Sequence, residues 1–420
     1  MIFNKSFISF ILVSTCLSTL NATTFNWNVG NGDWALGTNW NPVGPPTIND
    51  TANIANGGTP RTDTDSPTAG IVVTDNGSGI NFTSQNLTSQ TAIIGSTTGT
   101  SQVTVNALTW NNNTGAGSFL LGDFADGRIT IQNGGILNTT TTQAAANAGS
   151  SADITVQDPN SAWNNTGDFK VGLSGNIANF TVRQGAALNT GSIEFGVNAG
   201  NNFNAIIRDA NTTFTNAGNL VVGVSRTCTL SVNNSAKAST GSCVVGQNTG
   251  ITGTLTVNNA PPSGVTWTCT GNFTIAQSGT GIFNLTSNAT ASTGTTTIGS
   301  LAGSSGSATC DATSTWTNTG TLTIGSAGIG LMNVTNNSQV TAGSILMAVS
   351  NSGTLNVATN SRLTTGSITG GAGVGSFTLN NATLQASGVV PALFQASQQQ
   401  LSQTQAHSIA RLLPSLSRKI

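Results

Sequence analysis

Two closely spaced pairs of acidic residues are the side chains best suited to chemistry in this sequence. They are Asp63 with Asp65 and Asp123 with Asp126, and Asp153 follows the second pair. Paired carboxylates can bind calcium or act as acid and base in glycoside cleavage. Both pairs lie among Gly, Thr, Ser and Pro, where Asp commonly stabilises a turn through its own side chain. We therefore predict no catalytic residue, with a carbohydrate-active lyase or hydrolase as the alternative.

Other side-chain chemistry is scarce. Glu194 is the only glutamate and His407 the only histidine among the 420 residues, so a histidine cluster for a metal ion is excluded. A glycine-rich stretch at 370–375 has no helical pattern after it and no lysine nearby, which argues against a phosphate-binding loop. We predict neither a metal ion nor a cofactor.

Charged residues are rare, at 6% of the chain, and the net charge is -1. Typical soluble domains contain about a quarter charged residues. Without clustered Lys or Arg there is no electrostatic case for binding nucleic acid or an anionic membrane surface. Hydrophobic residues make up 37% of the chain, and disorder goes with low hydrophobicity and high charge. The chain is therefore expected to fold.

An export signal is predicted at the N-terminus. Lys5 precedes an apolar run from Phe7 to Leu20, and the small residue Ala22 follows. This order is typical of a secretory signal peptide, here residues 1–22, and the run is shorter than the ~20 residues that a membrane-spanning helix needs. We expect a secreted or cell-surface protein with no transmembrane segment in the mature chain.

Short strands in a repeat must position these side chains. An apolar stretch ending in Gly recurs about every 25 residues, and an apolar-polar-apolar triplet such as Val103-Thr-Val105 follows it. A step of about three strands cannot bury its apolar face alone, so stacked steps predict an all-β solenoid. The anchors are Ile94-Gly95, Leu121-Gly122, Val171-Gly172, Phe195-Gly196, Val222-Gly223, Val245-Gly246, Ile298-Gly299 and Ile324-Gly325, with degenerate copies at Ile275-Ala276, Met347-Ala348 and Ala146-Asn147.

A second period of about 50 residues lies on the first. Steps with a large aromatic residue at one position, called bulky here, alternate with steps that have a small residue there, such as Ala238 or Ala291, called lean. The repeating unit is therefore a pair of steps, one bulky and one lean. Alternating large and small side chains fills an interior without overpacking. We favour core packing; the alternative is an aromatic stripe that binds sugars. The aromatic ladder is Trp110, Trp163, Phe214, Trp267 and Trp316.

Polar residues recur at matching positions as well. Asn165, Asn216 and Asn318 each lie two residues after an aromatic residue. In a parallel stack equivalent residues lie on one another, so we predict buried Asn side chains hydrogen-bonded along a ladder.

Four cysteines, Cys228, Cys243, Cys269 and Cys310, fall within the repeats. Their spacings match no zinc motif. Each takes a different position of the repeat, and Cys269 replaces the recurring Asn. None is therefore expected to stack directly on another. We interpret them as small buried side chains, with a disulfide framework as the alternative.

The opening block, residues 25–54, has the form Trp, Gly-x-Trp, Asn-Trp, Pro and Asp-x-Ala-x-Ile. The matching residues are Trp27, Gly32, Trp34, Asn39, Trp40, Pro46, Asp50, Ala52 and Ile54. Together with the later repeats it resembles bacterial autotransporter-type passenger proteins with associated β-strand repeats, over roughly residues 25–390. The resemblance implies a right-handed parallel β-helix exported to the surface of a Gram-negative cell.

The first step of a solenoid exposes its core and an unpaired strand edge. We expect Trp27, Trp34 and Trp40 to cover that end as a structural cap; the alternative is a carbohydrate platform. The expected organisation is a signal peptide at 1–22, a Trp-rich cap and first turns at 23–94, β-helix repeats at 95–390, and a Gln/Ser-rich tail at 391–420, poorly ordered or a short helix.

Members of the family end in a membrane β-barrel, and this tail carries no such pattern. We therefore expect release, a separate outer-membrane anchor, or a truncated passenger without a function of its own. The function predicted is that of an exported, non-enzymatic passenger or adhesin-like structural protein that binds through repeated rod surfaces. The expected partners are surface glycans or surface proteins of host or neighbouring cells, and no nucleic acid.

Overall fold

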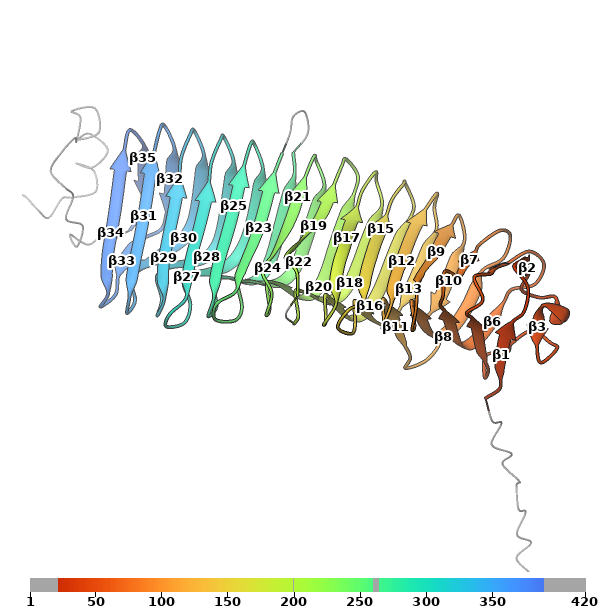
Figure 1. Cartoon of the computed structure of the whole chain (residues 1–420). Helices are drawn as coiled ribbons and strands as arrows, with labels where there is room; N and C mark the ends of the chain where they lie inside the picture. Colours follow the sequence, from red (N-terminus) through yellow and green to blue (C-terminus); the bar gives the residue numbers. More distant parts are fainter. Residues whose placement is uncertain (1–21, 199, 260–263, 389–420) are drawn as a thin grey trace, which may run out of the picture.

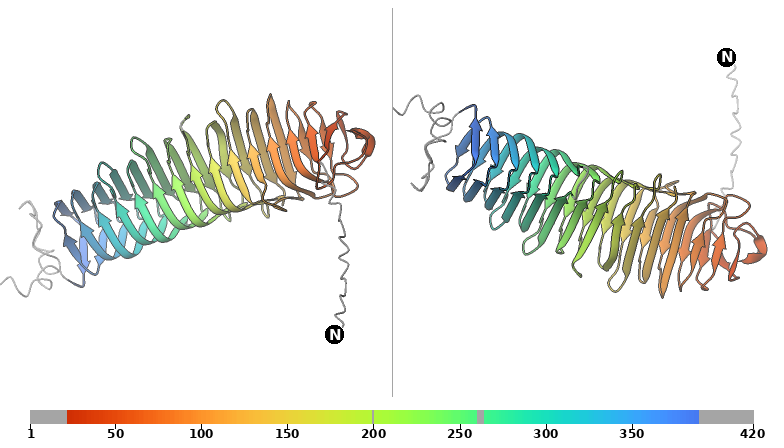
Figure 2. Two further views of the ribbon diagram at one scale, coloured as in Figure 1. Left: turned by 90° about the horizontal axis from the view of Figure 1, so that it is seen from below. Right: turned by 90° about the horizontal axis from the view of Figure 1, so that it is seen from above.

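The computed structural model describes residues 22–198, 200–259 and 264–388. The predicted signal peptide at 1–22, apart from its last residue Ala22, and the predicted tail at 391–420 lie outside these residues. The described chain winds into a long solenoid of stacked parallel strands (Figure 1), and Figure 2 shows the same rod from below and from above. The predicted all-β solenoid is confirmed, as is its period, because partners in adjacent coils such as Trp163 and Leu188 are 25 residues apart.

Each coil contributes one strand to a sheet of fifteen strands, called here the small sheet. Its strands alternate buried and half-exposed residues, which is the pattern of a sheet with one face on the core. The small sheet contains β2 (Asn31–Asp33), β5 (Thr59–Arg61), β7 (Gly79–Asn81), β9 (Thr100–Asn106), β12 (Asp126–Gln132), β15 (Ser151–Val156), β17 (Asn176–Val182), β19 (Phe203–Arg208), β21 (Cys228–Asn233), β23 (Thr252–Asn258), β25 (Thr280–Thr286), β27 (Ser305–Cys310), β29 (Ile329–Val334), β31 (Ser352–Ala358) and β34 (Val374–Asn380).

The remaining strands form a sheet of twenty, called here the large sheet. The one helical element of the described chain, the 3-10 turn η1 (Gly37–Asn39), precedes its strand β3. The large sheet contains β1 (Thr24–Trp27), β3 (Trp40–Asn41), β4 (Thr51–Ile54), β6 (Thr68–Thr74), β8 (Leu87–Ile94), β10 (Thr109–Asn112), β11 (Ser118–Leu121), β13 (Ile136–Thr139), β14 (Thr141–Ala144), β16 (Ala162–Val171), β18 (Ala187–Phe195), β20 (Thr213–Val222), β22 (Lys237–Val245), β24 (Thr266–Ile275), β26 (Thr290–Ile298), β28 (Thr315–Ile324), β30 (Gln339–Met347), β32 (Arg362–Thr365), β33 (Ile368–Gly370) and β35 (Thr383–Ala386).

The large sheet bends in the middle of each coil. Three strands per coil were predicted, but from β16 to β30 two of them are joined into one strand that changes register at the bend, as between Asn165 and Asp168. Glycine makes this possible, because a Cβ on Gly191 would lie 2.3 Å from the carbonyl oxygen of Thr166 in the coil before. The chain therefore turns the corner without a loop.

The recurring glycine anchors form the tight turn that follows the large sheet. Gly95 and Gly246 have φ of 76° and 75°, a left-handed conformation that glycine adopts freely. The degenerate anchors Ala276 and Ala348 adopt it as well, with φ of 66° and 51°. The third degenerate anchor is Ala145, with φ of 54°, rather than the predicted Ala146-Asn147. Two further alanines beside it made the position ambiguous in the sequence.

The N-terminal end of the solenoid is closed by the block at 25–54. Strand β3 runs antiparallel to β1, the one antiparallel pairing among the described strands, and it sets Trp40 opposite Trp27. Trp27, Trp34 and Trp40 are 3%, 1% and 1% exposed. The indole rings of Trp27 and Trp34 each meet the ring of Trp40 edge to face, with centroids 4.9 and 5.0 Å apart. The three indoles thus belong to the core that they close, and no flat indole platform faces solvent.

Candidate functional site

The five residues of the aromatic ladder lie in the interior, each at most 1% exposed. The strand register places Trp267 between Ala238 and Ala291 of the neighbouring coils, and Trp163 between Leu137 and Leu188. Bulky and smaller side chains therefore alternate along the axis. Because the rings lie inside the rod, a sugar cannot stack on them.

A buried relay of hydrogen bonds joins a bulky coil to the lean coil before it. The indole N–H of Trp163 donates to Thr139 Oγ1 at 3.0 Å, and that hydroxyl donates to Asn165 Oδ1 at 2.9 Å. Asn165 Nδ2 then donates to the carbonyl of Gly167 at the bend, at 2.8 Å. All three polar side chains are thereby satisfied away from water. The same relay recurs in Thr293, Trp316, Asn318 and Gly320.

This relay corrects the predicted interior ladder. Inside the rod, Asn alternates with Thr from coil to coil, because a hydroxyl can both accept from the indole and donate to the amide oxygen. Asn stacks on Asn on the outer face instead. Asn138, Asn164 and Asn189 each donate from Nδ2 to the amide oxygen of the Asn one coil earlier, at 2.7, 2.9 and 2.8 Å.

All four described cysteines are buried and carry free thiols. We call the residues that pair at one position of successive coils a column. The cysteines lie in the predicted columns: Cys310 lies between Leu285 and Val334, and Cys269 lies in the column of alternating Asn and Thr, between Thr240 and Thr293. Burial raises the pKa of the Cys310 thiol to about 12 and that of Cys269 to about 11. These thiols are poor nucleophiles at neutral pH.

Restoring the relay at Cys269 is expected to stabilise the reduced protein. Trp267 has no hydrogen-bond partner for its buried indole N–H, unlike Trp163 and Trp316, whose coils carry the relay Asn. Cys269→Asn supplies that Asn, so we expect about 1 kcal/mol of added stability under reducing conditions. The midpoint of urea unfolding measures it. Cys310→Asn is the matched control and should destabilise, because its column is apolar.

The predicted acidic residues are held separately by hydrogen bonds between coils. Asp63 forms an ion pair with Arg61 at 3.0 Å and accepts from the Thr83 hydroxyl. Asp123 accepts from Asn147 Nδ2 at 2.8 Å, and burial raises its pKa.

The remaining members of the second acidic set have similar bonds. Asp126 accepts from Ser151 Oγ at 2.6 Å, and Asp153 accepts from Asn179 Nδ2 at 3.1 Å on the outer face of the small sheet. Within the described ranges, no three Asp, Glu, His or Cys side chains gather closely enough to hold a metal ion.

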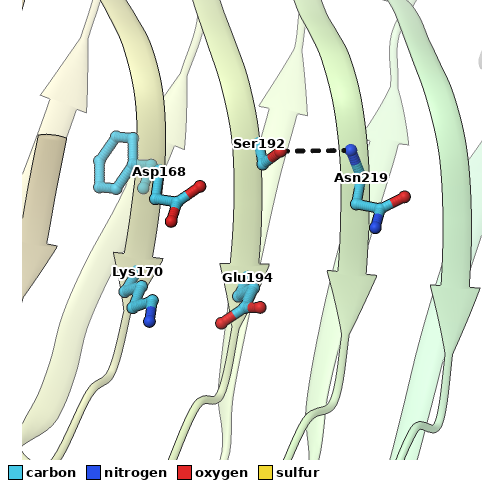
Figure 3. Close-up of a pocket in the computed structure, with 6 residues that line it drawn as sticks. Asp168, Lys170, Ser192, Glu194 and Asn219 are labelled. Carbon is cyan, nitrogen blue, oxygen red and sulfur yellow. Dashed lines mark hydrogen bonds between the residues drawn. The ribbon is translucent and has the colours of Figure 1, made fainter. Parts of the chain in front are cut away.

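A hollow of about 160 Å³ on the outer face of the large sheet gathers charged side chains that sequence reasoning did not connect. Asp168 and Lys170 alternate along β16, Ser192 and Glu194 along β18, and Asn219 follows on β20 (Figure 3). Lys170 and Glu194 are direct cross-strand partners. The hollow offers carboxylates, an ammonium group and an amide to a hydroxylated ligand. Alternating charges at one position of successive repeats are the sequence signal that could have found it.

No family model, curated protein or solved structure matches the chain. The described residues also contain no helix that is long and apolar enough to cross a membrane.

Proposed function

We propose that the protein is an exported, non-enzymatic rod, held at the cell surface or released, that binds its partner in an adhesin-like way through side chains repeated along its outer faces. The observation that carries the proposal is a file of hydroxyl groups on the outer face of the large sheet, one from each of seven successive coils. Each is exposed or half-exposed. The file is Thr215, Ser239, Thr268, Ser292, Thr317, Thr341 and Thr364.

The chemistry of these faces favours an uncharged, hydroxyl-rich partner. Between Ala238 and Ser361 the only charged residue is Asp311. Hydroxyl and amide groups in register offer hydrogen bonds at an interval of ~4.8 Å along the axis. Surface glycans fit such a face better than nucleic acid or an acidic membrane, which need clustered positive charge. Many weak contacts in file would act together as a multivalent site.

Export is the part of the proposal that depends on the predicted signal peptide. Cleavage after Ala22 would leave Thr23 as the first residue, just before β1 and the cap. A rod whose first coil is already closed can stand free of other domains at that end. N-terminal sequencing of protein recovered from the cell envelope or the medium should therefore begin at Thr23.

Removing two coils should shorten the rod without unfolding it. Deleting 267–315 joins Thr266 to Trp316, which the register makes equivalent to Trp267, and deleting 163–213 joins Ala162 to Phe214 in the same way. Each deletion keeps the alternation of bulky and lean coils. We expect a β-rich protein shorter by about 10 Å, measured by circular dichroism and X-ray scattering. An unfolded chain would contradict the repeat.

The same two deletions test how the rod binds. Binding to glycan arrays and to whole cells should fall several-fold in the 267–315 deletion, because it removes Thr268 and Ser292 from the file of hydroxyls. The 163–213 deletion leaves all seven hydroxyls in place and should bind as the intact chain does. Complete loss in the 163–213 deletion alone would place binding at the hollow of Asp168, Lys170 and Glu194. Cleavage of a polysaccharide by the intact chain, abolished by Asp123→Asn with Asp126→Asn, would overturn the non-enzymatic proposal.

A further inference from the structure

Two of the cysteines lie on adjacent coils, on either side of the bend in the large sheet. Cys243 is on β22 and Cys269 is on β24, and the two strands pair in parallel. The register sets Cys269 beside Thr240 and Cys243 beside Phe273, so the cysteines are diagonal neighbours across the corner. Both side chains point inward, at 1% and 0% exposure.

The repeat shows how close side chains at these two positions come. Thr142 and Asn165 occupy the same two columns four coils earlier, and Thr142 Oγ1 donates to Asn165 Oδ1 at 2.9 Å. Thr296 and Asn318 occupy them two coils later, with a corresponding distance of 2.7 Å. Contact between the two positions is therefore a property of the fold, and in one pair of coils both positions carry sulfur.

The backbone N–H of Cys243 also lies close to the sulfur of Cys269. Burial raises the pKa of Cys269, and the backbone N–H groups of Gly271 and Cys243, which face its sulfur, oppose that rise. A disulfide needs Cα atoms about 4–7 Å apart and side chains that meet, and the Thr-Asn contacts at these two positions in other coils show that the side chains meet. Cys228 lies beside Phe203 and Gly253, and Cys310 beside Leu285 and Val334, so neither faces another thiol.

We propose that Cys243 and Cys269 form a disulfide bond that links two coils inside the rod. The bond would stand where the hydrogen-bonded relay is interrupted, because Cys269 replaces the relay Asn. The Thr240 hydroxyl of the coil before donates to the Ser242 carbonyl instead, and the indole N–H of Trp267 has no partner. A covalent link between the coils takes the place of the missing polar one. The inference goes beyond the proposed function and draws on export only for the oxidising compartment in which the bond would form.

Formation of the bond needs a disulfide oxidant such as oxidised glutathione or a dithiol oxidase. One cysteine thiolate attacks the oxidant, forms a mixed disulfide and releases one thiolate from it. The second cysteine, after losing its proton, attacks the protein sulfur of the mixed disulfide and releases the other thiolate. Two cysteine thiols are oxidised and one disulfide is reduced to two thiols. Because both thiols are buried in the folded rod, the bond would form while these coils fold, before the thiols become inaccessible to the oxidant.

The test is to refold the full chain in a buffer of reduced and oxidised glutathione, then unfold it and alkylate the remaining thiols. We expect a mass about 2 Da below that of the reduced chain before alkylation, a cross-linked peptide containing Cys243 and Cys269, and alkylated Cys16, Cys228 and Cys310. Five alkylated cysteines, or cross-links spread over several pairs, would overturn the proposal. Refolding in vitro does not depend on export, so failure of the signal-peptide prediction leaves this result unaffected.

Two control variants keep the outcome interpretable if one of them folds poorly. Cys243→Thr with Cys269→Asn installs the residues found in the same columns of other coils, and should fold with no cross-link. Cys228→Ser with Cys310→Ser should keep the cross-link. Reducing agent should lower the thermal midpoint of the wild type and of the second variant, and leave the first unchanged. A midpoint insensitive to reducing agent in all three proteins would count against the bond.

Discussion

Asn165→Ala is expected to destabilise the rod by about 3 kcal/mol, because several buried polar groups lose their partners at once and each costs about 1–3 kcal/mol. Asn165 Oδ1 accepts from the hydroxyls of Thr139 and Thr142, and its Nδ2 donates to the Gly167 carbonyl. These side chains are at most 2% exposed. Water cannot replace the missing amide there without opening the coil.

The adjacent residue provides the matched control. Asn164 belongs to the outer amide ladder and is half-exposed, so water replaces its hydrogen bonds and Asn164→Ala should cost about 1 kcal/mol or less. Urea unfolding compares the free energies of unfolding of the two variants. Because a solenoid opens in local units, hydrogen exchange of β14, β16 and β18 shows where stability is lost. Equal effects of the two substitutions would show that the relay adds nothing to stability.

The fold could be predicted because the same pattern of residue types recurs in every coil of a solenoid. Each position of the repeat is apolar or polar in nearly every coil. The period can therefore be recognised even where one coil departs from the pattern, as at Ala276. The alternation of Trp267 with Ala238 and Ala291 followed from spacing alone, and the register of β22, β24 and β26 places them so. The autotransporter resemblance itself remains a prediction, supported by the fold and not by any match.

The contacts that could not be predicted are those between residues of different columns. Alignment of repeats shows which residues share a column, but the bend brings neighbouring columns of adjacent coils into contact. The bond from Thr142 to Asn165 is of this kind, and so is the approach of Cys243 to Cys269. The hollow around Glu194 also crosses strands, joining residues that alternate along β16 and β18. Such diagonal contacts depend on where the glycine bend falls, and periodicity alone does not give its geometry.

Trp40→Ala is expected to open the N-terminal end of the rod and cause concentration-dependent association. Trp40 is 1% exposed, packs against both other indoles of the cap, and donates from its indole N–H to the Trp34 carbonyl at 2.7 Å. Truncating a buried Trp to Ala costs about 3–5 kcal/mol. Here the loss also releases β3, which covers the outer edge of β1. An uncovered edge of parallel strands is a template for pairing with another chain.

Trp316→Ala separates this effect from simple loss of packing. It removes an equally buried indole, but from inside the rod between Ala291 and Val340, where the coils on both sides keep the strand edges paired. Both variants should unfold at lower urea concentration. Only Trp40→Ala should form larger species in light scattering as its concentration rises, with faster hydrogen exchange in β1 and β4. If both variants associate alike, the indoles are ordinary core and the end is protected by something other than the cap.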